Sequence, residues 1–162
     1  MVDHKSHDGD FPSTLWESLY SGVAEDYEEP DADIIEAVAD LDVGEALDVG
    51  CGAGGLCVEL SRCGWAVTGI DITHKAITAA RLVAAERGSD ARFVSADATT
   101  WQPEKSYDLV CNNFGLPPQL DRRIAVYAMM RCAVATGGVV LIKIWDHSGE
   151  QRSVPPVLVG YE

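Results

Sequence analysis

A glycine-rich segment near the centre of the chain limits the possible folds more than any other feature. It reads LDVGCGAGG from Leu47 to Gly55 and runs from a strand-like stretch directly into a helix-like one. Glycine permits the sharp turn and the close backbone approach to a ligand, and the start of the helix offers unpaired N–H groups. Gly50, Gly52 and Gly55 match the G-x-G-x-x-G pattern, so the pattern alone leaves a dinucleotide as one candidate ligand.

Short apolar stretches alternate with helical or turn-rich stretches through most of the chain. The expected strands are 46–49, 66–70, 92–95, 108–111 and 139–145. Apolar strands that alternate with helices predict an α/β fold, a doubly wound and mostly parallel sheet with helices on both faces. Right-handed crossovers then place a ligand crevice at the carboxyl ends of the strands.

Two long helices are expected from the apolar periodicity and the glycines that follow it. The first covers about 73–87, ends at Gly88 and has an inner face of Ile77, Ala80 and Ala84. The second covers about 122–135 and ends at Gly137-Gly138, and its expected inner face consists of Ile124, Ala128, Cys132 and Ala135.

Charge and cysteine content exclude several classes of function. The chain has a formal net charge of −14 and no basic patch, which disfavours tight binding to nucleic acid. Five cysteines without a CxxC pair argue against a disulfide framework and a zinc site, and they predict a reducing, cytoplasmic location. The longest apolar run, 139–142, is too short to cross a bilayer, so no membrane partner is expected.

Asp48 indicates whether the glycine-rich segment binds a dinucleotide or a positively charged ligand. A carboxylate two residues before Gly50 repels a pyrophosphate but attracts a ligand that carries an ammonium group. The string ALDVGCGAGG resembles the first motif of class I S-adenosylmethionine-dependent methyltransferases, and the similarity extends over about 34–145. The resemblance implies a Rossmann-like methyltransferase fold with S-adenosylmethionine held by Asp48, Gly50, Cys51 and Gly52.

Two further acidic residues follow the second and third expected strands, as in this family. Asp71 lies 19 residues after Gly52 and ends the string VTGID, so the resemblance implies that it accepts the ribose hydroxyls while Ile72 packs on adenine. Asp97 follows the string FVSA, and the resemblance implies that it accepts the adenine amino group while the Ala98 N–H meets the ring. No metal is expected.

The family carries its substrate-side residues after the fourth strand, where this chain has Asn112 and Asn113. Either amide can bind substrate or the methionyl end of the cofactor, or only satisfy the turn; we assign Asn112 to the cofactor and Asn113 to catalysis. Asp146 after the fifth strand is a candidate general base. Tyr20 belongs to a W-x-x-x-Y string that resembles the lid helix of small-molecule and thiol methyltransferases, so it is the third catalytic candidate.

The resemblance divides the chain into a tail and lid helix at 1–30 and a cofactor-binding domain at 31–162. The lid helix is expected to open at Pro12 and to be amphipathic as far as Val23. Beyond the fifth strand, 147–162 suffice for a loop and one strand near 157–160. The sheet is therefore expected to be trimmed at this edge, or the substrate face to be open or completed by another subunit in a homo-oligomer.

The sequence thus predicts methyl transfer from S-adenosylmethionine to a small-molecule acceptor, and two alternatives stay open. Lys143 lies inside the string GGVVLIKIW, which resembles the fifth strand of RNA ribose 2′-O-methyltransferases with their catalytic lysine. Against that alternative, asparagine stands where those enzymes need aspartate, and a structural role for Lys143 is favoured. The second alternative is a non-catalytic subunit that binds S-adenosylmethionine.

Overall fold

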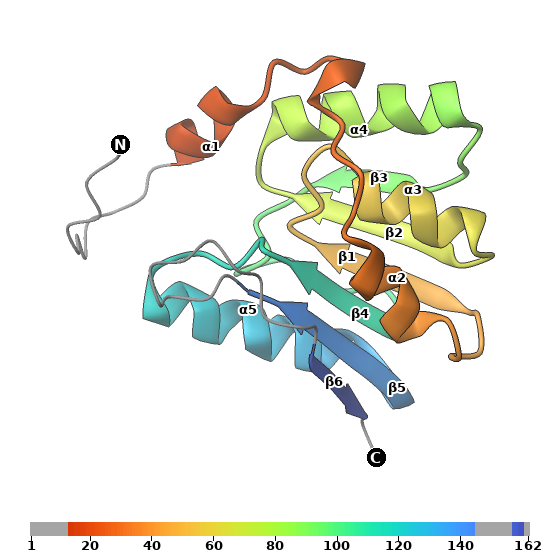
Figure 1. Cartoon of the computed structure of the whole chain (residues 1–162). Coiled ribbons are helices and arrows are strands. Elements are labelled where there is room, and N and C mark those ends of the chain that lie inside the picture. Colours follow the sequence, from red (N-terminus) through yellow and green to blue (C-terminus); the bar gives the residue numbers. More distant parts are fainter. Residues whose placement is uncertain (1–12, 145–156, 161–162) are drawn as a thin grey trace.

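The computed structural model describes residues 13–144 and 157–160, and a six-stranded sheet forms its centre (Figure 1). The strands are β1 (Glu45–Val49), β2 (Ala66–Asp71), β3 (Arg92–Ser95), β4 (Tyr107–Asn113), β5 (Val134–Lys143) and β6 (Val157–Gly160). Their order is β3-β2-β1-β4-β5-β6, and all neighbouring pairs are parallel except β5 and β6, which are antiparallel.

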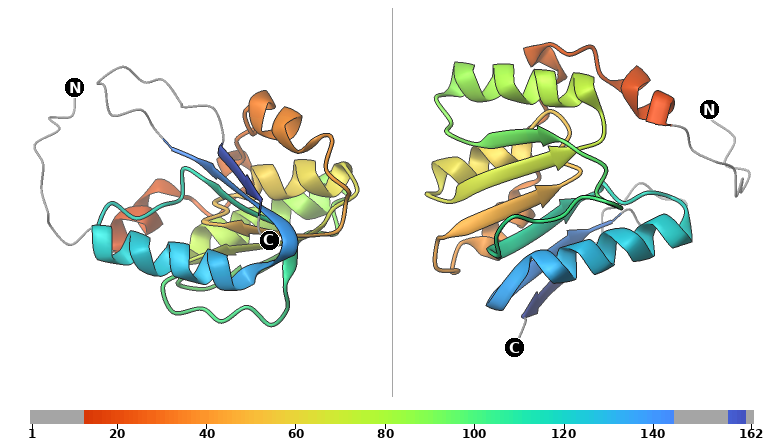
Figure 2. Two further views of the ribbon diagram at one scale, coloured as in Figure 1. Left: turned by 90° about the horizontal axis from the view of Figure 1, so that it is seen from below. Right: turned by 180° about the vertical axis from the view of Figure 1, so that it is seen from behind.

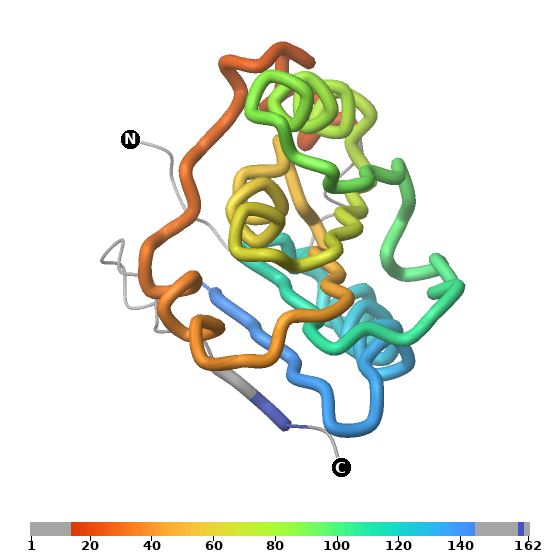
Figure 3. The backbone as a smooth tube through the Cα atoms, turned by 90° about the vertical axis from the view of Figure 1, so that its right-hand side faces the viewer, coloured from red at the N-terminus to blue at the C-terminus, as the bar shows by residue number. Residues whose placement is uncertain are grey.

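Helices cover both faces of this sheet (Figures 2 and 3). The helices are α1 (Ser13–Leu19), η1 (Ala24–Asp26), α2 (Ala32–Val38), α3 (Gly55–Arg62), α4 (His74–Arg87) and α5 (Leu120–Ala133). Apolar side chains of α2, α3 and α4 pack in one core layer, and those of α5 pack in a second layer on the opposite face. No helix in the described ranges is long and apolar enough to cross a membrane.

Side-chain alternation along the central strands supplies both core layers. In β1, Ala46 faces the layer of α3 and α4, whereas Leu47 and Val49 face the layer of α5. These three side chains are at most 1% exposed, because a parallel sheet covered on both faces leaves no solvated side to its inner strands.

The chain reverses its winding direction at β1, which lies between β2 and β4. Asp48 near the end of β1 is aligned with Gly69 of β2 and Cys111 of β4. The carboxyl ends of these strands therefore meet at one edge, where an open α/β sheet binds its ligands. The glycine-rich segment predicted from the sequence lies at this edge, between β1 and α3.

The predicted doubly wound, mostly parallel sheet is confirmed, including the single additional strand near 157–160. Helix α4 ends at Gly88, in the left-handed conformation, and buries the predicted face. The predicted start of the lid helix at Pro12 lies outside the described residues. At its other end α1 stops at Leu19, so the helix does not extend to Val23 as expected.

The predictions for α5 were wrong in its end and in its inner face. The helix ends at Ala133, because the backbone of Val134 is extended and pairs with Tyr107 of β4. Ile124 is 58% exposed, and Ala128 and Cys132 are also exposed. The residues that α5 buries are instead Val126, Met129, Met130 and Ala133.

This correction predicts a large effect on stability for one truncation on α5 and a small effect for another. Met130→Ala removes a side chain that is 1% exposed and should lower the free energy of unfolding by roughly 2–4 kcal/mol, because it leaves a cavity. Ile124→Ala should change it by less than about 0.5 kcal/mol. Urea unfolding of both variants measures the difference, and the reverse order of effects would restore the face predicted from the sequence.

Candidate functional site

The end of β2 holds the glycine loop between β1 and α3. The Ile70 carbonyl oxygen accepts hydrogen bonds from the N–H groups of Gly50 at 2.8 Å and Cys51 at 3.0 Å. Gly50, Gly52 and Gly54 have φ values of 72°, 52° and 82°, a left-handed conformation that side chains with a Cβ rarely adopt. The sequence needs these glycines because the loop must turn sharply while its amides face β2.

Asp71, the last residue of β2, also holds the loop. One carboxylate oxygen, Oδ2, accepts a hydrogen bond from the Gly52 N–H at 2.9 Å, and Oδ1 accepts one from the Thr73 N–H at 2.8 Å. A carboxylate can accept about four hydrogen bonds, so each oxygen of Asp71 keeps room for one more donor. Asp71 is half-buried at the carboxyl edge, and its position therefore fits a pair of ribose hydroxyls.

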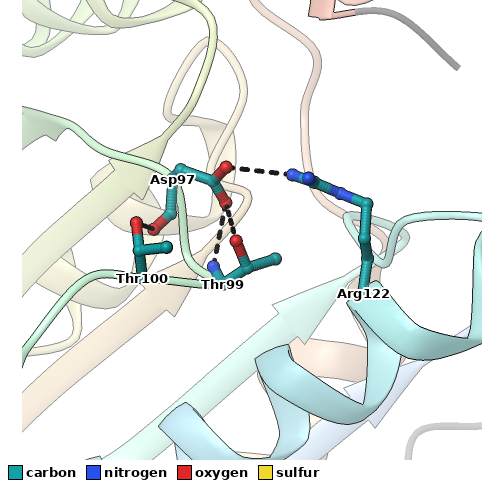
Figure 4. A network of polar contacts seen from close by, with 4 residues as sticks. All are labelled: Asp97, Thr99, Thr100 and Arg122. Carbon is teal, nitrogen blue, oxygen red and sulfur yellow. Dashed lines mark hydrogen bonds and ion pairs between the residues drawn. The ribbon is translucent and has the colours of Figure 1, made fainter. Parts of the chain in front are cut away.

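Asp97 lies after β3 and belongs to a network with Thr99, Thr100 and Arg122 (Figure 4). Its Oδ1 accepts hydrogen bonds from the Thr99 N–H at 2.9 Å and the Thr99 hydroxyl at 2.7 Å, and its Oδ2 lies 3.0 Å from Nη2 of Arg122. Partial burial raises the pKa of Asp97, but the bonds from Thr99 and Arg122 outweigh burial and hold the pKa below its usual value. Asp97 is thus an ionised acceptor.

Asp48 lies beneath the glycine loop and is only 2% exposed. Its Oδ2 accepts a hydrogen bond from the Cys57 thiol at 3.3 Å, and its Oδ1 has no partner within the described structure. Burial raises the pKa of Asp48 to about 7, and the Cys57 bond opposes this rise only in part. The Asp48 carboxylate is therefore bonded to α3 through Cys57 and retains one buried acceptor oxygen.

The two asparagines at the end of β4 differ in their surroundings. Asn112 is fully buried, and its amide donates a hydrogen bond to the Val49 carbonyl oxygen at 2.7 Å. Asn113 is partly exposed, and the side-chain oxygens of both residues are buried without a partner among the described residues. Asn112 thus ties β4 to the end of β1, and Asn113 lies nearer to the open edge.

The loop after β4 touches the glycine loop directly. A Cβ atom built on Gly50 would lie 2.9 Å from the Cα of Gly115, so the two backbones meet without room for a side chain. Phe114 precedes this contact with a φ of 59°, and its N–H donates to the Lys143 carbonyl oxygen at 3.0 Å. The loop after β4, which is predicted to face the substrate, and the glycine loop, which is predicted to face the cofactor, are therefore in contact.

Tyr20 extends over the glycine loop from the segment after α1. A Cβ atom built on Gly52 would lie 2.6 Å from the Tyr20 hydroxyl. Burial, reinforced by the charge of Asp71, raises the pKa of Tyr20 to about 12. At neutral pH this hydroxyl stays protonated, so it can donate a hydrogen bond but cannot act as a general base.

Lys143 is fully buried at the end of β5. Its charge is balanced by two carboxylates, one just before α2 and one in the first turn of α2. Its Nζ lies 2.6 Å from Oδ2 of Asp31 and 2.6 Å from Oδ1 of Asp33. Burial alone lowers the pKa of Lys143, but the two carboxylates outweigh burial and raise it above its usual value. The favoured structural role of Lys143 agrees with this geometry, since a proton-accepting lysine needs a lowered pKa.

Most of the predicted site residues meet at one edge of the sheet. Those that are partly exposed there are Gly50, Gly52, Asp71, Ile72, Asp97, Ala98, Asn113 and Tyr20. Asp48, Cys51 and Asn112 are buried behind them. Asp146 lies outside the described residues. Within the described ranges no three metal-binding side chains are arranged to hold an ion.

Sequence reasoning missed Arg122, which contacts a predicted site residue. Its contact with Asp97 spans 25 residues and depends on how α5 lies against the loop after β3. The only available signal was an arginine in the first turn of the helix that follows the substrate-side loop.

Comparisons with known proteins agree with this geometry. A family model described as methyltransferase domain matches residues 46–138. Trans-aconitate 2-methyltransferase of Klebsiella pneumoniae (strain 342) is 28% identical over 133 residues, 80% of this chain and 50% of that protein. Ribosomal RNA small subunit methyltransferase C of Alcanivorax borkumensis is 38% identical over 81 residues, 49% of this chain and 23% of that protein.

A solved structure is also similar over most of the chain. It comes from work on the conversion of a disulfide bond into a thioacetal group during echinomycin biosynthesis. Its TM-score is 0.70 at 28% identity, and the match covers 85% of this chain and 62% of that one. The chain spans about half the length of its trans-aconitate relative.

The buried Asp48 predicts an unusual dependence of stability on pH. Its pKa of about 7 in the folded state exceeds the value near 4 expected when unfolded, so between these values the native state binds more protons. Its contribution therefore lowers the free energy of unfolding as pH rises from about 4 to about 7. Asparagine does not titrate, so the free energy of unfolding of Asp48→Asn, taken relative to that of the wild type, should rise by roughly 2–3 kcal/mol from pH 5 to pH 8.

Urea unfolding at the two pH values measures this rise. Any effect of the amide group that is the same at both pH values cancels in the comparison. Asp40→Asn, at an exposed position, is the control and should follow the wild type at both pH values. Equal pH dependence of the wild type and Asp48→Asn would show that Asp48 is already ionised at pH 5.

Proposed function

Because this chain belongs to the methyltransferase domain family, we propose that it transfers the methyl group of S-adenosylmethionine to a small-molecule acceptor. The family match over 46–138 confirms the resemblance predicted from the sequence and the predicted cofactor. The single observation that carries the proposal is Asp71, which holds the glycine loop and still has acceptor capacity for two hydroxyls.

In this proposal the cofactor lies along the carboxyl edge of β1, β2 and β3. Asp71 accepts the ribose hydroxyls, and Asp97 accepts the adenine amino group. Ile72 and Ala98 border the ring, and Gly50, Cys51 and Gly52 face the methionyl end. Asp48 and Asn112 support that end from behind, since each keeps a buried oxygen without a partner among the described residues.

The charge of the site supports a cationic ligand. S-adenosylmethionine supplies a methyl group on a sulfonium, which is activated for in-line displacement. Carboxylates approach this edge from several elements: Glu17 accepts from the His74 N–H at 2.7 Å, and Asp26 and Glu28 influence the hydroxyl of Tyr20. Such an edge attracts positive charge and repels phosphates.

The chain's own residues are proposed to position the acceptor and exclude water rather than to form a covalent intermediate. Tyr20 covers the glycine loop, and its hydroxyl stays protonated and is therefore available to donate a hydrogen bond to the acceptor. Asn113 offers its unpartnered oxygen to the acceptor, and Asp146 is proposed as the general base. The segment at 1–30 is proposed as a tail and lid, and 31–162 as the cofactor-binding domain.

A small acceptor fits this edge better than RNA. One relative's name refers to trans-aconitate and another's to ribosomal RNA, so the names alone do not decide. The formal net charge of −14 opposes binding to a phosphate backbone. Lys143, the candidate for ribose methylation, is paired with Asp31 and Asp33. A substrate face that is open, or completed by a second copy of the chain in a homo-oligomer, and a cytoplasmic location complete the proposal.

The cofactor proposal predicts that Asp71→Ala weakens binding of S-adenosylhomocysteine by about 1–3 kcal/mol, because a charged acceptor for two hydroxyls is lost. Titration calorimetry measures this change, and Asp90→Ala is the control, since it removes the same charge at an exposed position before β3. The 2′-deoxy analogue should bind the wild type more weakly, and Asp71→Ala should reduce this discrimination. Binding of NAD but not of S-adenosylhomocysteine would overturn the proposal.

The acceptor proposal predicts methyl transfer from labelled S-adenosylmethionine to members of a panel of carboxylic acids, phenols, thiols and amines. Neither transfer to RNA nor retention of RNA should occur. Salt-dependent retention of RNA at low micromolar protein, abolished by Lys143→Ala, would contradict the proposal. A chain that binds S-adenosylhomocysteine yet is active only with a second protein would favour the non-catalytic subunit.

A further inference from the structure

The ion pair between Asp97 and Arg122 connects the two halves of the sheet edge. Asp97 follows β3, whereas Arg122 lies in the first turn of α5, which follows the loop after β4. Strands β2 and β1 separate β3 from β4 in the sheet. The 3.0 Å contact between Nη2 and Oδ2 therefore joins the proposed adenine end to the helix behind the substrate-side loop (Figure 4).

The hydrogen bonds of Asp97 leave one defined acceptor position. The N–H and the hydroxyl of Thr99 both donate hydrogen bonds to Oδ1, and Arg122 donates one to Oδ2. A carboxylate offers about four acceptor positions, two on each oxygen. The remaining position is on Oδ2, the oxygen that Arg122 holds.

Helix formation does not explain an arginine at this place. A cation in the first turn opposes the helix dipole, which favours acidic residues there. The side chains of Arg122 and Asp97 are 40% and 31% exposed, and a pair so open to water adds little to folding stability. The contact therefore has more effect on the orientation of the carboxylate than on the fold.

We propose that Arg122 is a positioning residue for adenine recognition, acting through Asp97. Its guanidinium fixes the direction of Oδ2, so that the remaining lone pair points at the adenine amino group. This inference rests on the proposed function, because it needs S-adenosylmethionine in the site. It adds a residue from α5 to a cofactor site that is otherwise formed by residues at the ends of β1, β2, β3 and β4.

The affinities for two ligands distinguish this positioning role from a general stabilisation of the site. The first is S-adenosylhomocysteine, and the second is S-inosylhomocysteine, in which an oxygen replaces the adenine amino group. Titration calorimetry with both ligands is applied to the wild type, Arg122→Gln, Arg122→Lys and Arg131→Gln. Arg131 is the matched control, because it is an exposed arginine in the last turn of the same helix.

The wild type should prefer the adenine ligand by about tenfold or more. Arg122→Gln should lose about 3- to 10-fold in affinity for S-adenosylhomocysteine and bind the inosine analogue as the wild type does. Arg122→Lys keeps a cation and should retain most of the preference, and Arg131→Gln should behave as the wild type. The melting temperature of Arg122→Gln should stay within about 2 °C of the wild type.

Unchanged affinity of Arg122→Gln for S-adenosylhomocysteine would overturn the inference. An equal loss for both ligands would do the same, since a general stabilisation acts on the whole site and not on the amino group. If the wild type binds neither ligand, the proposed function itself fails, and the inference fails with it.

Discussion

Three hydrogen bonds from the glycine loop to the end of β2 organise the whole site. The carbonyl oxygen of Ile70 and the carboxylate of Asp71 accept from Gly50, Cys51 and Gly52, so the loop after β1 cannot move without β2. The neighbouring loop after β4 packs on Gly50 through Gly115 and on the other side is bonded to β5. Four parallel strands thus determine where a ligand can lie at their carboxyl ends.

The same edge carries an excess of acidic groups, and their surroundings divide them into different roles. Asp71 and Asp97 receive hydrogen bonds and keep acceptor capacity, which suits neutral hydroxyl and amino groups of a ligand. Asp31 and Asp33 are committed to the buried Lys143. Asp48 is buried with a raised pKa, so a positive group nearby would favour its ionised form. A cationic ligand would relieve this excess of negative charge.

The sequence predicted the parts of this structure that depend on local rules. Strands covered on both faces are continuously apolar, and Gly88 ends α4 because a glycine tolerates the left-handed conformation. Asp71 was found because it ends β2, and Asp97 because it comes two residues after β3. The placement of the glycine loop followed from residues that are neighbours in the chain.

Contacts between distant segments could not be predicted in this way. Helix α5 has apolar residues on more than one side, so periodicity selected Ile124 although the packing against the sheet selects Met130. The partners of Lys143 lie 110 and 112 residues away, and Arg122 reaches Asp97 only because α5 lies beside the loop after β3. Each of these contacts depends on the completed fold.

A crystal structure with S-adenosylhomocysteine tests the central claim most directly, namely that Asp71 both holds the glycine loop and binds the ribose. We expect each carboxylate oxygen of Asp71 to accept one ribose hydroxyl within about 2.5–3.0 Å while it keeps its bond from Gly52 or Thr73. A ligand bound elsewhere, or an Asp71 that releases Gly52 to reach the ribose, would contradict the claim.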